Sequence, residues 1–360
     1  MKLAVLSLKG AEKEGTTVEI CKAGKQFFDE VKAFVLSDAK VEVHAGTFID
    51  SLNLEEFDCI YLRGSYKYSK LLTSIALSIE GKVYMPLKPE SFLIAHDKFL
   101  TLQYLHKAKV PVPLTYLIYN TQLAKEVLDR FVYPVVFKLP EGTQGKGVIF
   151  ADTKESASSI IDMLDKFGIK PFFIEEYIET GATDIRAFVI GNEVFAMKRI
   201  AKPGELRANI HAGGIGKPIE LDWESKQIAI KAVRACGMQI GAADLLQTKH
   251  KTYVVEVNAS PSIIGISKAL NKNLAQFIAK FLHEKTKEFK GEQKESRYKE
   301  MKQKIKSYKA GTELIVPLDI KGSAIKLPPQ IMKIINFSPA DEVAIKADDG
   351  YIELKRIKLS

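Results

Sequence analysis

Cysteine is scarce in this sequence, and long apolar runs are missing. Three cysteines, Cys21, Cys59 and Cys236, are spread over 360 residues. They are too few and too scattered for a disulfide framework or a zinc site built on paired cysteines. No apolar stretch reaches the roughly 18 residues of a membrane span, and residues 1–9 are apolar for too short a length to be a secretory signal. These absences predict a soluble protein of a reducing cytoplasm with no membrane partner.

The charge is positive but unevenly distributed. The chain has 53 Lys and Arg against 44 Asp and Glu, a net charge of +9, which would suit a nucleic-acid-binding protein. Residues 284–310 hold ten basic and five acidic residues, so more than half of the excess lies there. A short run of mixed charge is usually a solvated helix or linker. DNA is therefore a disfavoured partner, although the sequence leaves it open.

The chain divides into blocks of different pattern. Residues 1–95 alternate strand-like runs (2–8, 41–43 and 58–62) with polar segments of helical length, which predicts a small α/β domain with a parallel sheet. Residues 96–283 form a larger α/β block, residues 284–310 a charged linker or helix, and residues 311–360 a small β-rich module. In the larger block, strands are expected at 114–119, 133–139, 148–150, 172–174, 185–190, 193–198 and 253–257, and helices at 97–108 and 155–167. The predicted fold class is α/β.

A glycine-rich loop joins two of these predicted strands. Three glycines in residues 140–147 would let backbone N–H groups turn toward an anion. The loop is not a Walker A motif, because Pro140 stands where the first glycine is needed and Gly147 where Ser or Thr is needed. Taken alone, it is best explained as an ordinary hairpin. However, Lys138 lies in the apolar strand before it and Lys98 starts the preceding helix, and such lysines could hold phosphates.

Acidic and amide side chains gather near the end of the block. Glu256 and Asn258 share one face of a predicted strand, and a hairpin turning at residues 248–251 would bring Asp244 opposite Glu256. Carboxylate and amide oxygens are the hard ligands that suit Mg²⁺. A strand end capped by an Asx turn at Asn258 explains the same spacing equally well.

Arginines end or interrupt the neighbouring strands. Asp184 and Arg186 share a strand face, Arg199 ends the next strand, and Arg207 and Asn209 follow in an alternating segment that ends in two glycines. Arginines aimed at one cavity would repel each other unless an anion joined them. Surface salt bridges are the alternative explanation.

Taken together, these segments resemble the ATP-grasp ligases, and within them the RimK-like group that adds glutamate or related amino acids to a carboxylate. The resemblance covers about half the chain, and the matching segments occur in the family's order: 138–145, 176–178, 184–186, 207–214, 244 and 256–261. It implies a two-lobed ATP-grasp core preceded by a pre-ATP-grasp domain, to which residues 62–64 belong. ATP and Mg²⁺, with Mn²⁺ as an alternative ion, would be the cofactors.

The resemblance also implies roles for single residues. Those at the nucleotide would be Lys98, Lys138, the lid residues Gly142, Thr143, Gln144 and Gly145, the hinge residues Glu176, Tyr177 and Ile178, Asp184, Arg207 and Asn209. Those that hold the metal would be Asp244, Glu256 and Asn258. Arg199, Arg207 and Asn209 would act on the γ-phosphate and the acyl phosphate, and Arg186 would bind a substrate carboxylate.

The sequence departs from the family where substrates differ. After Pro261 it continues Ser262-Ile263-Ile264-Gly265, where relatives often have Gly-Leu-Glu-Gly, and it lacks the Thr-Thr run of the lysine-biosynthesis relatives. The glutamate-adding branch is therefore the closer one. Residues 311–357 resemble an AbrB/SpoVT-type module, a swapped-hairpin dimer that often binds DNA, but the module is neutral, with seven basic and seven acidic residues in 311–360. Dimerisation is therefore favoured over DNA binding.

The function implied is an ATP-dependent carboxylate–amine ligase that works through an acyl phosphate. Its partners would be an amino-acid donor, a carboxylate acceptor and a second copy of the chain in a dimer or dimer of dimers. Two alternatives stay open: a kinase that stops at phosphoryl transfer, and a DNA-binding regulator with a ligand-sensing core. The acceptor, the amino acid and the number of residues added are not determined by the sequence.

Overall fold

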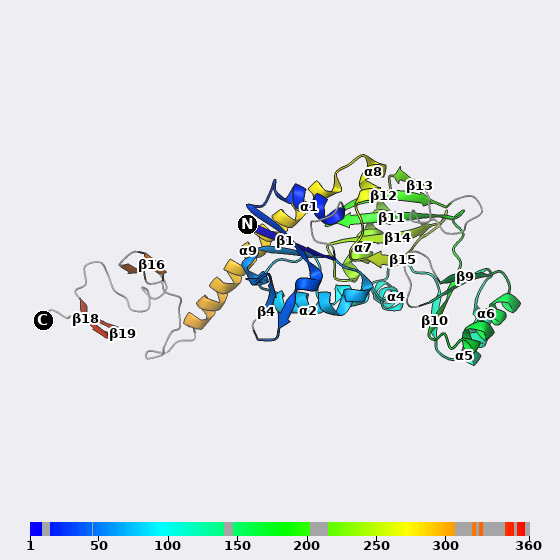
Figure 1. Cartoon of the computed structure of the whole chain (residues 1–360), viewed down its shortest axis with the longest axis horizontal. Helices are drawn as coiled ribbons and strands as arrows, with labels where there is room; N and C mark the ends of the chain where they lie inside the picture. The colour runs from blue at the N-terminus through cyan, green and yellow to red at the C-terminus, as the bar shows by residue number, and fades with distance from the viewer. Residues whose placement is uncertain are drawn as a thin grey trace. The chain divides into compact units, whose positions relative to one another are not determined.

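The computed structural model describes residues 1–8, 15–44, 46–139, 147–201 and 215–306, and four short strands beyond them (Figure 1). The chain divides into two compact units, Met1–Phe289 and Lys290–Ser360. The first unit contains three successive α/β parts, and the second contains the C-terminal strands.

The N-terminal part is built on a parallel sheet, as the sequence predicts. Strands β2 (Glu30–Val35), β1 (Lys2–Ser7) and β6 (Cys59–Leu62) lie in that order, and β1 is fully buried from Leu3 to Leu6. Helices α1 (Thr16–Gly24), α2 (Ser69–Ile79) and α3 (Ser91–Ile94) accompany it. Strand β2 was not predicted, because only Phe34 of its six residues is buried and its apolar pattern is weak. A small antiparallel sheet of β3 (Lys40–Glu42), β4 (Gly46–Ile49) and β5 (Leu52–Asn53) completes this part.

The middle part is a four-stranded antiparallel sheet in the order β7 (Thr115–Ile118), β10 (Phe172–Glu176), β8 (Val135–Lys138) and β9 (Val148–Ala151). Helices α5 (Thr121–Val127) and α6 (Lys154–Lys166) cover one of its faces (Figure 1), and they share a core with the alternate strand residues Phe137, Phe172 and Ile174. The opposite face therefore stays free of this core and carries Lys138, Phe173 and Glu175, which follow the same strand alternation.

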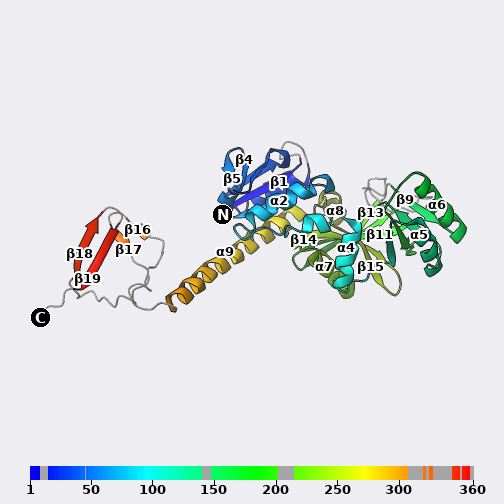
Figure 2. The same cartoon turned by 90° about the horizontal axis from the view of Figure 1, so that it is seen from below.

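The third part is a five-stranded antiparallel sheet. Its order is β13 (Ile215–Ile219), β12 (Glu193–Ile200), β11 (Thr183–Ile190), β14 (Ile240–Gln247) and β15 (Thr252–Asn258). Helix α7 (Trp223–Ala235) packs on β14 and β15, α8 (Ile264–Leu270) on β12 and β13, and α4 (Lys98–Lys107) on the edge strand β15 (Figure 2). This sheet and the N-terminal parallel sheet share one hydrophobic core.

Helix α9 (Leu274–Lys306) runs through most of the charged segment. Beyond it, β16 (Asp319–Lys321) pairs with β17 (Ala324–Lys326), and β18 (Val343–Asp348) with β19 (Tyr351–Arg356), all antiparallel. In the C-terminal module the sequence also predicts a strand at 314–317 and a short helix at 328–335, and both lie outside the described residues. Among the helices described, none combines the length and the hydropathy needed to cross a bilayer.

We expect Gly191→Ala to lower the free energy of unfolding by about 2–4 kcal/mol. Gly191 has φ +61° in the turn between β11 and β12, and a Cβ there would lie 2.5 Å from Cε2 of Phe281. Gly168→Ala is the matched control, because Gly168 has φ +64° with nothing within 4 Å of the added Cβ. Its cost should stay near ~1–2 kcal/mol. Equal losses for both variants in urea denaturation would contradict the steric part of this explanation.

Candidate functional site

Two carboxylates face each other across the β14–β15 pair. Asp244 is the register partner of Glu256, and Asn258 follows two residues later. The turn predicted at 248–251 is present, since the Thr248 N–H donates to the Lys251 carbonyl at 2.9 Å. A regular hairpin from this turn would set Asp244 opposite Val255, but a β-bulge between Asp244 and Leu245 shifts the register by one. The predicted pairing is therefore confirmed, and the bulge, which the sequence did not reveal, produces it.

Asp244 is buried and held by two arginines. The Arg186 guanidinium makes a bidentate contact, in which its Nε donates to Asp244 Oδ1 at 2.9 Å and its Nη2 donates to Oδ2 at 2.8 Å. The Nη2 of Arg199 lies 2.9 Å from the same Oδ2. Arg199 also pairs with Asp184 on the neighbouring strand. The anionic groups that pair with these arginines are thus the side-chain carboxylates of Asp184 and Asp244. The pairs are not surface salt bridges, since Asp244 and Arg199 are both 5% exposed.

The two aspartates titrate in opposite directions. Burial alone would raise the pKa of Asp244, but Arg186 and Arg199 outweigh it and hold that pKa at about 2. Burial and, to a lesser extent, the charge of Asp244 raise the pKa of Asp184 to about 6, because attraction to Arg199 and Arg186 only partly offsets these two effects. Asp244 is therefore the permanently charged member of the group.

Glu256 keeps its side chain open to solvent, although neighbouring protein atoms remove part of the hydration of its carboxylate. This loss of hydration raises its pKa, and so does the charge of Asp244, while Arg186, Lys98 and Lys138 act against both effects. The negative charge of Glu256 is thus only partly compensated. Within the described ranges no three or more His, Cys, Asp or Glu side chains cluster as a metal site, so an ion here would also need Asn258 and ligand oxygens.

The two predicted phosphate lysines lie within electrostatic reach of Glu256. Lys138, on β8, pairs with the buried Glu175 of β10, and Lys98, at the start of α4, donates to the Leu139 carbonyl at 3.3 Å. Burial lowers the pKa of Lys98, and Glu256 partly restores it. Helix α4 and the middle sheet therefore each contribute a lysine to the region in which the five-stranded sheet contributes the carboxylate of Glu256.

Glu175 was missed by the sequence reasoning. The strand Phe172–Glu176 ends in two glutamates, and only Glu176 was predicted to lie at the site. Strand alternation places Glu175 on the face of Phe173 and Lys138, which was the available signal.

The residues predicted as the hinge lie at the end of β10 and in the connection from β10 to β11. Glu176 is bonded to Leu114 twice, by its backbone N–H to the carbonyl at 2.9 Å and by its Oε1 to the N–H at 2.8 Å. The ring of Tyr177 meets Phe150 edge-on with centroids 5.8 Å apart, and Ile178 is buried. The remaining predicted residues lie outside the described ranges: Gly142, Thr143, Gln144, Gly145, Arg207 and Asn209.

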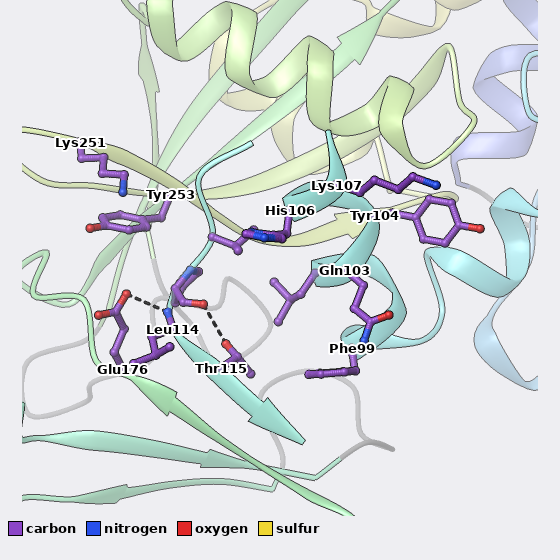
Figure 3. Close-up of a pocket in the computed structure, with 13 residues that line it drawn as sticks. Phe99, Gln103, Tyr104, His106, Lys107, Leu114, Thr115, Glu176, Lys251 and Tyr253 are labelled. Carbon is purple, nitrogen blue, oxygen red and sulfur yellow. Dashed lines mark hydrogen bonds between the residues drawn. The ribbon is translucent and has the colours of Figure 1, made fainter. Parts of the chain in front are cut away.

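A cavity of about 890 Å³ adjoins this hinge (Figure 3). Its wall is formed by α4, residues 112–115, Glu176, and Lys251 and Tyr253 of the β15 end. It does not contain Asp244, Glu256 or Lys138. Thr115 links this cavity to Lys138, because the Thr115 Oγ1 donates at 3.3 Å to Oε2 of Glu175, the carboxylate that pairs with Lys138. No pattern in the sequence predicted this cavity.

Comparison with known proteins identifies the core. Residues 95–282, more than half of the chain, match the family model described as the RimK-like ATP-grasp domain. The chain belongs to the RimK-like ATP-grasp family. The six segments that carry the resemblance, from residue 138 to residue 261, all lie within the matched region.

Curated relatives and a solved structure extend this match. A probable alpha-L-glutamate ligase of Legionella pneumophila is 40% identical over 196 residues, which are 54% of this chain and 65% of that protein, so the match spans less than two thirds of the relative. A protein of the same description from Alcanivorax borkumensis is 31% identical over 309 residues, 82% of this chain and 100% of that protein. The ATP-grasp ligase PsnB, solved with a variant of its minimal precursor, Mg and ADP, is 16% identical over 79% of this chain and 98% of its own, with a TM-score of 0.63. That likeness shows the ATP-grasp fold.

We predict that Glu256→Gln makes the metal-free protein more stable at pH 7.5 but not near pH 4. The folded-state pKa of Glu256 is raised, so its ionisation disfavours the folded state progressively as pH rises above the unfolded value of about 4.3. Melting temperatures in EDTA at both pH values would check this. Glu193→Gln, at an exposed position of the same sheet, should change neither value. A lower melting temperature for Glu256→Gln at pH 7.5 would contradict the electrostatic assignment.

Asp244→Asn should have the opposite effect and lower the free energy of unfolding by about 3–5 kcal/mol. It removes the carboxylate shared by Arg186 and Arg199, and leaves buried positive charge without compensation. The control is Lys125→Ala, which breaks an exposed ion pair with Asp162 and should cost at most about 1 kcal/mol. Chemical denaturation at pH 7 compares them. A loss for Asp244→Asn no greater than that of the control would show that the cluster does not stabilise the sheet.

Proposed function

We propose that the protein is an ATP-dependent carboxylate–amine ligase that joins an amino acid, with glutamate favoured, to a carboxylate acceptor. The observation that carries the proposal is the facing pair Asp244 and Glu256, set within electrostatic reach of Lys98 and Lys138. The descriptions of the relatives as probable alpha-L-glutamate ligases support the reaction class and the amino acid.

The donor set fits a magnesium ion. Two carboxylates and an amide are hard oxygen ligands, and the Asn258 Nδ2 is buried with no hydrogen-bond partner among the described residues. An amide that the protein leaves unsatisfied is compatible with a ligand there, since its two ends are interchangeable by rotation. Asp244, Glu256 and Asn258 would hold Mg²⁺, or Mn²⁺ as the alternative, which supplies charge neutralisation to the triphosphate when bound. PsnB, of the same fold, was solved with Mg and ADP.

The other residues divide by chemistry. Lys98 and Lys138 would contact the phosphates as point charges, and the residues proposed at the remainder of the nucleotide are Gly142, Thr143, Gln144, Gly145, Glu176, Tyr177, Ile178 and Asp184. Arg199, Arg207 and Asn209 would stabilise the γ-phosphate and the acyl phosphate. Arg186 would bind a substrate carboxylate with the donors that Asp244 does not occupy.

The reaction has two steps. An acceptor carboxylate oxygen attacks the γ-phosphorus, the bond to the ADP oxygen breaks, and an acyl phosphate forms. The amine nitrogen then attacks the acyl carbon, the bond to phosphate breaks, and the nitrogen loses a proton as the amide forms. No protein nucleophile is needed, so the residues contribute position and charge.

The test follows oxygen from the acceptor. A screen of amino acids and carboxylates for stimulated phosphate release would first identify a substrate pair. With the acceptor carboxylate labelled with ¹⁸O, a ligase must transfer one labelled oxygen to the released phosphate, and only when the amine is present. Label retained in a phosphorylated acceptor would instead identify a kinase. Glu256→Ala should abolish ATP turnover, whereas Glu193→Ala should retain it. ADP formation that needs neither substrate would contradict the proposal.

The C-terminal unit is proposed to be the AbrB/SpoVT-like module and to act in dimerisation. Its support is the sequence resemblance of residues 311–357 and the two antiparallel pairs, β16 with β17 and β18 with β19. A cytoplasmic location is likewise proposed from the composition.

A further inference from the structure

Arg63 is a buried arginine with an unusual set of partners. It follows β6 directly, at the carboxyl end of the N-terminal parallel sheet, and is 6% exposed. Its guanidinium donates to the carbonyls of Pro261 at 2.8 Å and Ser260 at 3.4 Å, and to the Tyr61 hydroxyl at 3.1 Å. In the described part of the chain no carboxylate pairs with it. Because burial of an uncompensated charge is costly, these carbonyl contacts require an explanation.

The same segment is fastened at two further points. The Gly64 N–H donates to Ser260 Oγ at 3.0 Å, and the Ile263 N–H donates to Thr16 Oγ1 at 3.1 Å. Residues 259–263 belong to no strand or helix. Their position is therefore fixed by these bonds to the N-terminal part and by the burial of Ala259 and Ile263.

This segment begins directly after the proposed metal ligand Asn258. Strand β15 ends at Asn258, whose backbone pairs with Ala242. The Nδ2 of Asn258 has no partner among the described residues, so no bond to that nitrogen directs the amide. Asn258 therefore lies at the point where β15 passes into the loop that Arg63 holds.

We propose that Arg63 is a positioning residue for the metal site. It holds the carbonyls of Ser260 and Pro261 and so orients Asn258, and it thereby couples the N-terminal sheet to the metal-binding end of β15. The inference rests on the proposed function, because it concerns the metal of that same site. Arg63 does not contact the proposed metal ligands Asp244 and Glu256, so it would act on the metal site only through the loop that it holds.

The test measures metal-dependent nucleotide binding and needs no substrate. A fluorescent ATP analogue is titrated onto the full chain at increasing Mg²⁺. Arg63→Ala should raise the Mg²⁺ concentration for half-maximal binding by about 10-fold or more, as outer-sphere substitutions typically do. Binding without Mg²⁺ should not change, and Arg63→Lys, which retains a donor, should recover part of the loss. A general structural defect would weaken both kinds of binding.

Two further comparisons keep the inference falsifiable if Arg63→Ala folds poorly. Ser260→Ala removes only the bond to Gly64 and should shift the Mg²⁺ requirement in the same direction by less. In an Asn258→Ala background, Arg63→Lys should add no further shift, because the residue through which it acts is gone. Lys82→Ala, which breaks an exposed ion pair with Glu55 in the N-terminal part, is the control.

An unchanged Mg²⁺ requirement in folded Arg63→Lys and Ser260→Ala, or additive shifts in the double variant, would overturn the role of Arg63. If the unsubstituted protein bound no nucleotide at any Mg²⁺ concentration, the proposed function itself would be contradicted, and this inference with it.

Discussion

The site depends on one buried carboxylate, that of Asp244, held between Arg186 and Arg199. Three adjacent strands, β12, β11 and β14, contribute these groups, so the ion pairs also fix how the strands align. Burial of charge is favourable only when the geometry is good and hydrogen bonds satisfy both partners. Here the bidentate contact of Arg186 meets that condition. Burial and then the charge of Asp244 raise the pKa of Glu256 on the next strand, while Arg186, Lys98 of α4 and Lys138 of β8 partly offset both effects.

Under the proposed function, this arrangement would bind a cation and an anion together. Asp244 and Glu256 place two negative charges side by side, while Lys98 and Lys138 bring positive charge from α4 and β8. A magnesium nucleotide carries both complementary charges and would relieve the strain on Glu256. The same crowding that disfavours the metal-free state thus favours binding, as is common where function requires perturbed carboxylates.

Much of this was predictable from sequence. The apolar runs and the Gly and Pro positions predicted most strands of the core. Residue type and order predicted the facing pair Asp244 and Glu256, and selected Lys98 and Lys138, which lie within electrostatic reach of Glu256. The apolar pattern of the sequence did not predict β2. Only Phe34 of this strand is buried, so its residues show no clear alternation of apolar and polar side chains. Nor did it give the β-bulge that sets Asp244 opposite Glu256, or the pairing of Lys138 with Glu175. Bulges and ion-pair choices depend on contacts between strands, which a linear pattern does not encode.

The most direct test is to locate the metal itself. Crystals grown with Mn²⁺ and a non-hydrolysable ATP analogue would reveal the ion by its anomalous scattering. We predict an anomalous peak about 2.0–2.2 Å from carboxylate oxygens of Asp244 and Glu256. The triphosphate should lie between these carboxylates and Lys138. A bound nucleotide whose metal contacts neither carboxylate, with Asp244 bonded only to its two arginines, would contradict the account.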